Sequence, residues 1–292
     1  MLSRRSFRVI PPVQLLAHVT LALLSVACLL PLWLIISASF TDDRALARTG
    51  FRIWPQDWSF SAYQYILADP EQLMHSYVVT IVVTVLGVTL GVLMTAGLAW
   101  PLARKDFALA RPLSFFVFFT MLFNGGLVPY YLLVTRYLQI GNSILALLVP
   151  FLVVPFYVLI LRTYFAQIPQ DLLDAAAIDG AGELRTFFRI VLPISRPALA
   201  TVGLLLALLY WNDWQTALYF IRDPQLYPLQ YLLYAILENA RALAASPTNV
   251  STPVSSIPLQ MAMAVLATGP AALAFLFFQK HLVRGISIGA IK

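Results

Sequence analysis

The sequence has little charge, a single cysteine and few histidines. Only 11% of its 292 residues are charged, whereas 60% are hydrophobic, and a chain with so little polar surface does not fold as a soluble domain. Cys28 is the only cysteine, which excludes an intrachain disulfide and a thiolate metal cluster. The three histidines, His18, His75 and His281, show no ligand spacing. We therefore expect no metal site.

Sequence motifs of catalysis are also missing. There is no G-x-x-x-x-G-K-[ST] phosphate loop, so the chain cannot hydrolyse ATP in the P-loop manner. Neither an H-E-x-x-H pair nor a G-x-S-x-G turn is present, and both are signatures of hydrolases. We expect no catalytic residue and no cofactor bound by this chain. ATP and Mg²⁺ would be bound by a separate subunit.

Long apolar runs dominate the chain instead. A run of about 20 apolar residues is long enough to cross a bilayer as a helix, and six such runs predict an all-α, multi-pass membrane protein. We expect one transmembrane domain over residues 1–292, with an N-terminal segment 1–12, an uncleaved first span and a C-terminal tail 280–292. The predicted spans are about 13–40, 77–100, 113–131, 144–165, 198–219 and 257–279.

The basic residues predict the orientation. Thirteen of the nineteen Lys and Arg residues lie on one side of the six-span arrangement, and such an excess marks the cytoplasmic side. We expect both termini and the loop 169–197 in the cytoplasm. This bias explains the net charge of +6, which therefore gives no indication of nucleic-acid binding.

The loop 169–197 is the most strongly charged interval between the later apolar runs. Asp171 opens a short helical pattern, Gly180 ends it, and Glu183 opens a second helix that continues to Pro193. Leucines and alanines give the first helix an apolar stripe: Leu172, Leu173, Ala176 and Ala177. So short a helix is marginal alone in water, and we expect it to lie in a groove of another protein.

The spacing in this loop resembles the EAA loop of ABC importer permeases. An acid precedes a glycine by six positions, and a proline follows that glycine by thirteen. The matching residues are Asp174, Ala175, Ala176, Gly180, Leu192 and Pro193. The resemblance implies a cytoplasmic coupling helix that docks into a cleft of the ATP-hydrolysing subunit. Asp174 stands where the family usually has Glu, which shortens the reach of the charge. The alternative is an ordinary amphipathic loop.

Two predicted spans, the third and the fifth, carry residues suited to a substrate path. The third contains Asn124 and a Gly-Gly pair, followed by Tyr130 and Tyr131, and a break in a membrane helix is tolerated where it lines a cavity. A simple kink is the alternative. The fourth contains two prolines, Pro150 and Pro155, which favour a bent helix.

The fifth predicted span carries an aromatic and polar cluster. An ionised Asp in such a helix costs about 2.5 to 3.5 kcal/mol, so it needs a reason. Aromatic faces stack on sugars, and amides and carboxylates bind paired hydroxyls; alternatively, the acid reaches water and pairs with Arg222. An acid on the path would repel a uronate unless the acid is paired or protonated. The cluster is Trp211, Asn212, Asp213 and Trp214.

The remaining segments extend the resemblance over nearly the whole chain. The aromatic stretch 51–67, the N-G-G-L-x-P-x-Y pattern and the tail 279–292 are similar to carbohydrate-importer permeases of the maltose-permease type, in the subset for complex sugars. Gly87 and Gly91 form a G-x-x-x-G pair, which predicts close packing against a neighbour, with the partner permease as a candidate.

The resemblance implies a function and a set of partners. It implies an inner-membrane permease subunit that imports an oligosaccharide or polysaccharide, alginate among the candidates, by ATP-driven alternating access. The implied partners are a second homologous permease, two ATP-binding subunits, a periplasmic binding protein and membrane lipid. An ion-coupled secondary sugar transporter is the alternative, with Asp213 as its one candidate coupling site in the spans.

Overall fold

The computed structural model describes residues 12–245 and 257–272, and this part of the chain is helical with no strand. The expected all-α class is therefore confirmed. Contacts divide the described residues into two compact units, one formed by 12–68 with 237–245 and 257–266, and the other by 69–236 with 267–272. Segments 1–11, 246–256 and 273–292, including most of the predicted N-terminal segment and the predicted C-terminal tail, lie outside the described residues.

The first unit contains a long helix followed by two short ones. Trp33 donates its indole N–H to the carbonyl of Ile53 at 2.8 Å, and the hydroxyls of Ser39 and Tyr63 lie 2.9 Å apart. Phe40 stacks on Tyr63 with ring centroids 4.8 Å apart. These contacts hold the aromatic stretch 51–67 against the C-terminal end of the first helix. The helices are α1 (Pro12–Ser39), α2 (Asp43–Thr49) and α3 (Ser61–Ile66).

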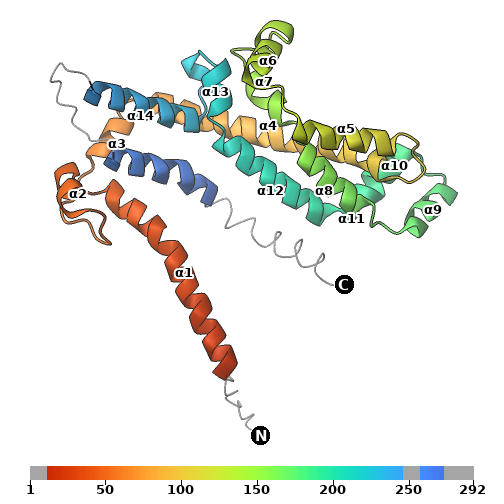
Figure 1. Cartoon of the computed structure of the whole chain (residues 1–292), viewed down its shortest axis with the longest axis horizontal. Coiled ribbons are helices and arrows are strands. Elements are labelled where there is room, and N and C mark those ends of the chain that lie inside the picture. Colours follow the sequence, from red (N-terminus) through yellow and green to blue (C-terminus); the bar gives the residue numbers. More distant parts are fainter. Residues whose placement is uncertain (1–11, 246–256, 273–292) are drawn as a thin grey trace. The chain divides into compact units, whose positions relative to one another are not determined.

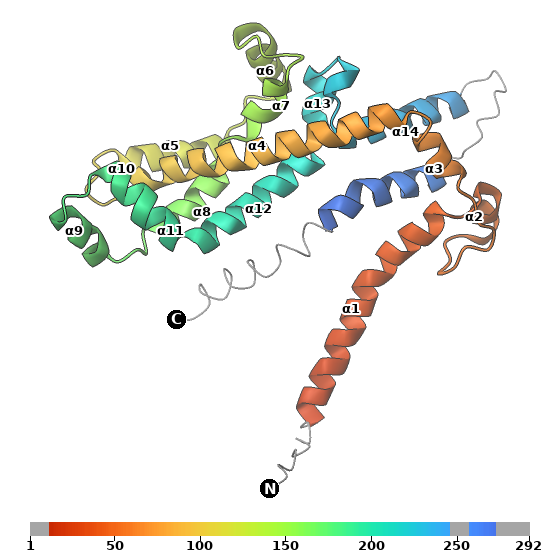
Figure 2. The same cartoon turned by 180° about the vertical axis from the view of Figure 1, so that it is seen from behind.

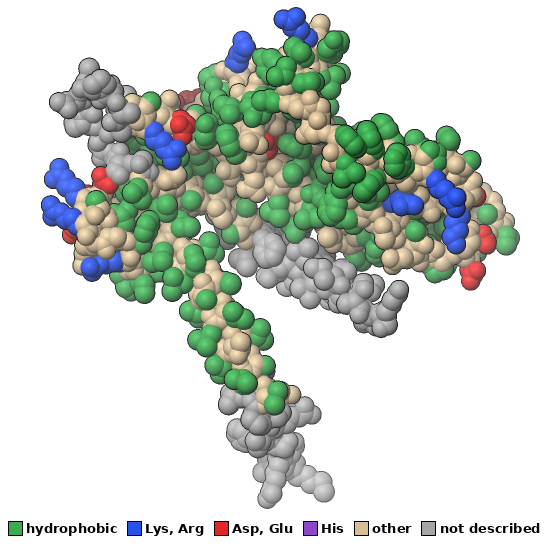
Figure 3. Space-filling model, in the orientation of Figure 1, with side chains coloured by type: hydrophobic (Ala, Val, Ile, Leu, Met, Phe, Trp, Pro, Cys, Tyr) green, Lys and Arg blue, Asp and Glu red, His purple; other side chains and the backbone are tan. Residues whose placement is uncertain are grey.

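Helix α1 exposes apolar side chains along its whole length (Figure 3). Leu16 is 68% exposed and Leu29 62% exposed. An apolar surface of this extent is not stable in water, whereas the hydrocarbon core of a bilayer accepts it. Lipid or another membrane protein must cover α1.

The second unit is built around α4 (Figures 1 and 2). Helix α12 packs along α4, and α8 packs on both α4 and α5. The helical segments up to the charged loop are α4 (Pro70–Ala103), α5 (Ala110–Leu122), α6 (Leu127–Leu132), η1 (Leu133–Tyr137), α7 (Ile144–Leu148), η2 (Val149–Phe151) and α8 (Pro155–Phe165). Those that follow are α9 (Gln170–Ile178), α10 (Glu183–Thr186), η3 (Phe187–Val191), α11 (Leu192–Ile194), α12 (Arg196–Asn212), α13 (Gln215–Phe220) and η4 (Pro224–Leu226). Helix α14 (Leu229–Ala245) begins in this unit.

The predicted spans correspond to straight helices and to broken ones. Helix α1 and helix α4 are each long and apolar enough to cross a membrane, and three bent pairs reach that length together. The pairs bend by 112° at residues 123–126, 46° at 152–154 and 81° at Ser195. A further apolar helix, Ile257–Ala272, is shorter. The bend expected from Pro150 and Pro155 is confirmed, while the count of six spans stays a prediction.

The predicted span 198–219 is not one helix. Helix α12 begins at Arg196 and ends at Asn212, and α13 is a separate element. Asp213 has an extended backbone, and its carboxylate accepts a hydrogen bond from the backbone N–H of Thr216 at 3.2 Å. The side chain therefore replaces a lost helical bond, as short polar side chains do at helix ends.

The G-x-x-x-G pair of α4 packs against this chain itself. A Cβ atom on Gly87 would lie 2.4 Å from the ring of Tyr210, and one on Gly91 would lie 3.2 Å from Leu206. Tyr210 is buried and donates its hydroxyl to the carbonyl of Leu148 at 2.7 Å. The neighbour of the glycine pair is therefore α12 of the same chain and not the partner permease that the sequence suggested. The Tyr210 ring fills the space beside Gly87.

We predict that Gly87→Ala destabilises the protein by about 1–3 kcal/mol, the usual cost of overpacking. The Tyr210 ring is held by its hydrogen bond and cannot move aside without losing it. Thermal unfolding of the detergent-purified transporter measures the effect. Gly97→Ala is the matched control, since nothing lies within 4 Å of its Cβ position. Equal melting temperatures for the two variants would contradict the packing argument.

Candidate functional sites

The loop predicted to couple to an ATPase folds as helix, turn and helix. Helix α9 ends at Ile178 and is followed, two residues later, by Gly180 in a left-handed conformation with φ of +74°. The N–H of Gly180 donates to the carbonyl of Ala177 at 3.0 Å, and that of Ala181 donates to the carbonyl of Ala176 at 2.9 Å. This pair of bonds is a Schellman motif, which favours glycine at its left-handed position. The sequence-predicted bend is therefore at Gly180.

Helix α9 is exposed on most of its surface. Asp174 is exposed and its carboxylate accepts a hydrogen bond from the amide of Gln170 at 3.0 Å. Ala175 is exposed, and Ala176 is buried. The predicted apolar stripe is divided, because Leu173 and Ala176 face the protein while Leu172 and Ala177 are exposed. The exposed part of the stripe is free to contact another protein.

The second half of the loop is helical but not regular. Helix α10 passes into a π-helical turn, η3, and then into α11, which carries Leu192 and Pro193. Both residues are half-buried, and Leu192 packs against the core. The chain then bends by 81° into α12. The structure thus places the Asp174–Gly180 part and the Leu192–Pro193 part of the motif on different helices.

An arginine missed by the sequence reasoning ties this loop to α4. Arg104 follows the last residue of α4 and donates from one terminal nitrogen to both carboxylate oxygens of Glu183, at 3.0 Å each. Its Nε donates to Asp106 at 2.8 Å, and its other terminal nitrogen also contacts Asp106. The guanidinium carbon lies 5.5 Å from the ring centroid of Trp100. We call Arg104, Asp106 and Glu183 the Arg104 cluster.

Arg104 stabilises the ionised form of one carboxylate of the Arg104 cluster, that of Asp106. Hydrogen bonding by Arg104 holds the pKa of the Asp106 carboxyl below its ordinary value. A carboxyl with a lowered pKa in the folded state contributes stability at neutral pH, and this contribution is lost as the pH falls through the lowered value. Asp106 and Glu183 are both more than half exposed, so solvent screening keeps the contribution small.

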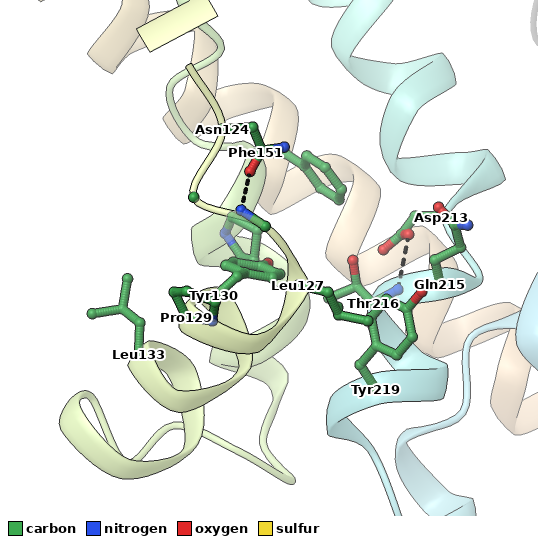
Figure 4. A pocket seen from close by; sticks show the side chains of 13 residues that line it. Asn124, Leu127, Pro129, Tyr130, Leu133, Phe151, Asp213, Gln215, Thr216 and Tyr219 are labelled. Carbon is green, nitrogen blue, oxygen red and sulfur yellow. Dashed lines mark hydrogen bonds between the residues drawn. The ribbon is translucent and has the colours of Figure 1, made fainter.

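The break between α5 and α6 opens onto a pocket of about 710 Å³ (Figure 4). Asn124 accepts a hydrogen bond from the N–H of Gly126 at 2.9 Å and so stabilises the break. Tyr130 lies on the same wall, and Asp213 on the facing one. The structure therefore brings together Asn124, Tyr130 and Asp213, three of the seven residues that the sequence assigned to a substrate path.

The other four predicted path residues do not line this pocket. Trp211 donates its indole N–H to the carbonyl of Ala267 at 3.0 Å. Trp214 stacks on Tyr234, with centroids 4.4 Å apart, and Tyr131 stacks on Phe220. Asn212 is exposed, and its amide bonds to the carbonyl of Leu208 in its own helix. The aromatic residues of the cluster thus have packing roles inside this chain.

The ion pair suggested between Asp213 and Arg222 is absent. Among the ion pairs of the described residues, none joins these two side chains. The backbone N–H groups of Arg222 and Asp223 instead donate to the side-chain oxygen of Asn142, each at 2.9 Å. Asn142 has φ of 53°, a conformation that asparagine tolerates better than most residues. These two hydrogen bonds hold the segment that follows α13 in place.

Sequence reasoning also missed part of the pocket wall. Asp213 carries the only full charge among the described lining residues. Amide, hydroxyl and aromatic groups make up much of the remaining wall, which is chemistry suited to a polyhydroxylated ligand. Phe151, for example, comes from a three-residue turn inside a predicted span and gave no local signal. The missed residues are Pro150, Phe151, Gln215, Thr216 and Tyr219.

Broken membrane helices around a pocket, together with an exposed charged loop, define a membrane transport protein. The sequence matches the family described as binding-protein-dependent transport system inner membrane component over residues 87–288, which is more than half of the chain. The chain therefore belongs to this family and is an inner-membrane component of such a transport system.

Individual proteins support this assignment. The chain is 34% identical to the polygalacturonan/rhamnogalacturonan transport system permease protein YtcP of Bacillus subtilis, over 96% of this chain and 98% of YtcP. It is 36% identical to protein LplC of the same organism, over 90% and 89% of the two chains. A chain in the crystal structure of a bacterial ABC transporter involved in the import of the acidic polysaccharide alginate is 29% identical, with a TM-score of 0.74 and coverage of 96% and 99%. The expected ABC importer permease fold is thereby confirmed.

We predict that Gly180→Val loosens the end of α9. A branched side chain in the left-handed conformation costs about 1–2 kcal/mol, which corresponds to roughly tenfold faster exchange of the last α9 amides. Hydrogen–deuterium exchange over residues 174–181 measures this change.

Gly182→Ala serves as the matched control for that substitution. Gly182 has φ of −70°, and nothing lies within 4 Å of its Cβ position. Exchange at the wild-type rate in both variants would show that the turn does not depend on glycine at position 180.

Proposed function

We propose that this chain is a permease subunit of an ATP-driven importer that moves an oligosaccharide across the inner membrane. The single observation that supports the proposal most is the EAA-like loop, whose acid, glycine and proline fall at family spacing and whose first helix is exposed. Ile178 is 86% exposed and Leu184 75% exposed. These exposed apolar side chains, one on α9 and one on α10, suit a cleft in a partner subunit.

The proposed assembly contains the subunits that this chain does not supply. A second homologous permease would complete the substrate path, two ATP-binding subunits would hold ATP and Mg²⁺, and a periplasmic binding protein would deliver the sugar. Both termini and the loop 169–197 would face the cytoplasm, as the excess of basic residues predicts. Closure of the ATPase pair would move α9, and the spans would alternate between outward and inward access.

The proposed substrate is a fragment of an acidic polysaccharide. Its support is the naming of YtcP for polygalacturonan and rhamnogalacturonan and of the structural relative for alginate. The pocket of this chain is suited to sugar hydroxyls through Asn124, Gln215 and Tyr130, but it offers Asp213 and no base among its described residues. Basic groups for a uronate would therefore come from the partner permease or the binding protein.

We predict that uptake by the reconstituted transporter requires ATP and is abolished by Asp174→Lys or Gly180→Asp. The first substitution reverses the charge offered to the ATPase, and the second places a side chain in the left-handed turn. Uptake of galacturonan oligosaccharides and ATP hydrolysis are measured in proteoliposomes with loaded binding protein. Uptake driven by an ion gradient without ATP would instead support the secondary-transporter alternative.

A further prediction concerns the charge in the pocket. Asp213→Asn should raise the uptake of acidic relative to neutral oligosaccharides at least several-fold, since a like charge within several ångströms costs on the order of 1 kcal/mol even when well screened. Gln215→Glu, on the same pocket wall, should shift the ratio in the opposite direction. Competition between a galacturonate trimer and maltotriose measures the ratio. An unchanged ratio in both variants would remove this pocket from the path.

A further inference from the structure

The Arg104 cluster joins two segments that lie 79 residues apart in sequence. Glu183 is the first residue of α10 and is separated from α9 by the short turn at Gly180. Arg104 directly follows α4. The contact between Arg104 and Glu183 therefore connects the loop that carries α9 to the end of α4.

The arginine is held firmly on the α4 side. Its Nε and one terminal nitrogen engage Asp106, and its plane lies over Trp100, which is itself buried and contacts Phe165 of α8. The end of α4 is further fixed because the Nε of Arg162, on α8, donates to the carbonyl of Leu102 at 3.0 Å. Only the remaining nitrogen of Arg104 reaches Glu183. The guanidinium group thus binds Asp106 through two nitrogens and Glu183 through the third, a planar geometry that the ammonium group of a lysine does not offer.

An open volume lies beside the contact between Arg104 and Glu183. A pocket of about 610 Å³ lies between the end of α4 and the start of the second loop helix, with Trp100, Arg104, Glu183 and Phe187 among its lining residues. Phe187 opens the π-helical turn η3, and such turns often occur at functional sites. The ion pair between Arg104 and Glu183 thus lies beside an open volume, whereas Thr186 and Phe187, one turn further along the loop, are buried.

We propose that Arg104 is a positioning residue that transmits movement of the loop 169–197 to α4 through Glu183. This inference rests on the proposed coupling function of the loop. Helix α4 is unbroken from Pro70 to Ala103 and contacts Tyr210 at Gly87. Movement of α4 at Arg104 would therefore reach α12 through Tyr210. Asp213, which lines the pocket, directly follows α12.

The test compares Arg104→Gln, Arg104→Lys and Glu183→Gln in the full transporter reconstituted in proteoliposomes with binding protein and galacturonan oligosaccharides. Uptake and ATP hydrolysis are measured in the same vesicles. We expect Arg104→Gln and Glu183→Gln each to lower uptake per ATP by about fivefold or more, the lower end of typical coupling between sites. Arg104→Lys should also have a lower uptake per ATP than the wild type. The double variant Arg104→Gln/Glu183→Gln should lose no more uptake per ATP than the more affected of the two single variants.

Arg111→Gln is the matched control, because Arg111 is an exposed arginine on the neighbouring helix α5. Should Arg104→Gln assemble poorly, Glu183→Gln decides, since its side chain is 69% exposed and its removal leaves the fold intact. Wild-type uptake per ATP in Glu183→Gln, or additive losses in the double variant, would overturn the inference. Absence of ATP-dependent uptake by the wild-type transporter would instead overturn the proposed function itself.

Discussion

The close approach of α4 and α12 is the contact on which the rest of the second unit depends. Glycine at position 87 lets the Tyr210 ring lie against the α4 backbone, and the Tyr210 hydroxyl then reaches the carbonyl of Leu148. The same ring meets Phe151 edge to face, with centroids 5.6 Å apart. One aromatic side chain of α12 therefore contacts α4, α7 and η2, and η2 supplies Pro150 and Phe151 to the wall of the pocket.

A second constraint explains where the helices break. Backbone groups at membrane depth need partners, so interruptions are tolerated where side chains or a cavity satisfy them. The breaks at Gly126 and at Asp213 both lie on the pocket, and each is stabilised by a side chain of the break itself, Asn124 in one case and Asp213 in the other. Asn124 and Asp213 each accept a backbone hydrogen bond that stabilises the break. Their remaining hydrogen-bonding groups are available to a substrate.

Local patterns predicted the parts of the fold that local physics determines. Hydropathy located α1 and α4 to within several residues, and the Asn-Gly-Gly signal located the break before α6. Hydropathy wrongly predicted one continuous helix over 198–219, because it averages over the run and does not detect that α12 ends before Asp213. The contact of Arg104 with Glu183 had no local signal at all, since nothing in either segment specifies a partner 79 residues away.

The two routes from α9 to the pocket differ in stiffness. The covalent route passes through the π-helical turn η3 and the 81° bend at Ser195 before it enters α12, and both features absorb displacement by local rearrangement. The route through space enters α4, a helix of 34 residues and thus about 51 Å long at 1.5 Å per residue. Helix α4 continues without a break through Pro101, so it links Arg104 to Gly87 along one helix. The side-chain contact is for this reason the stiffer connection, although the chain itself takes the other path.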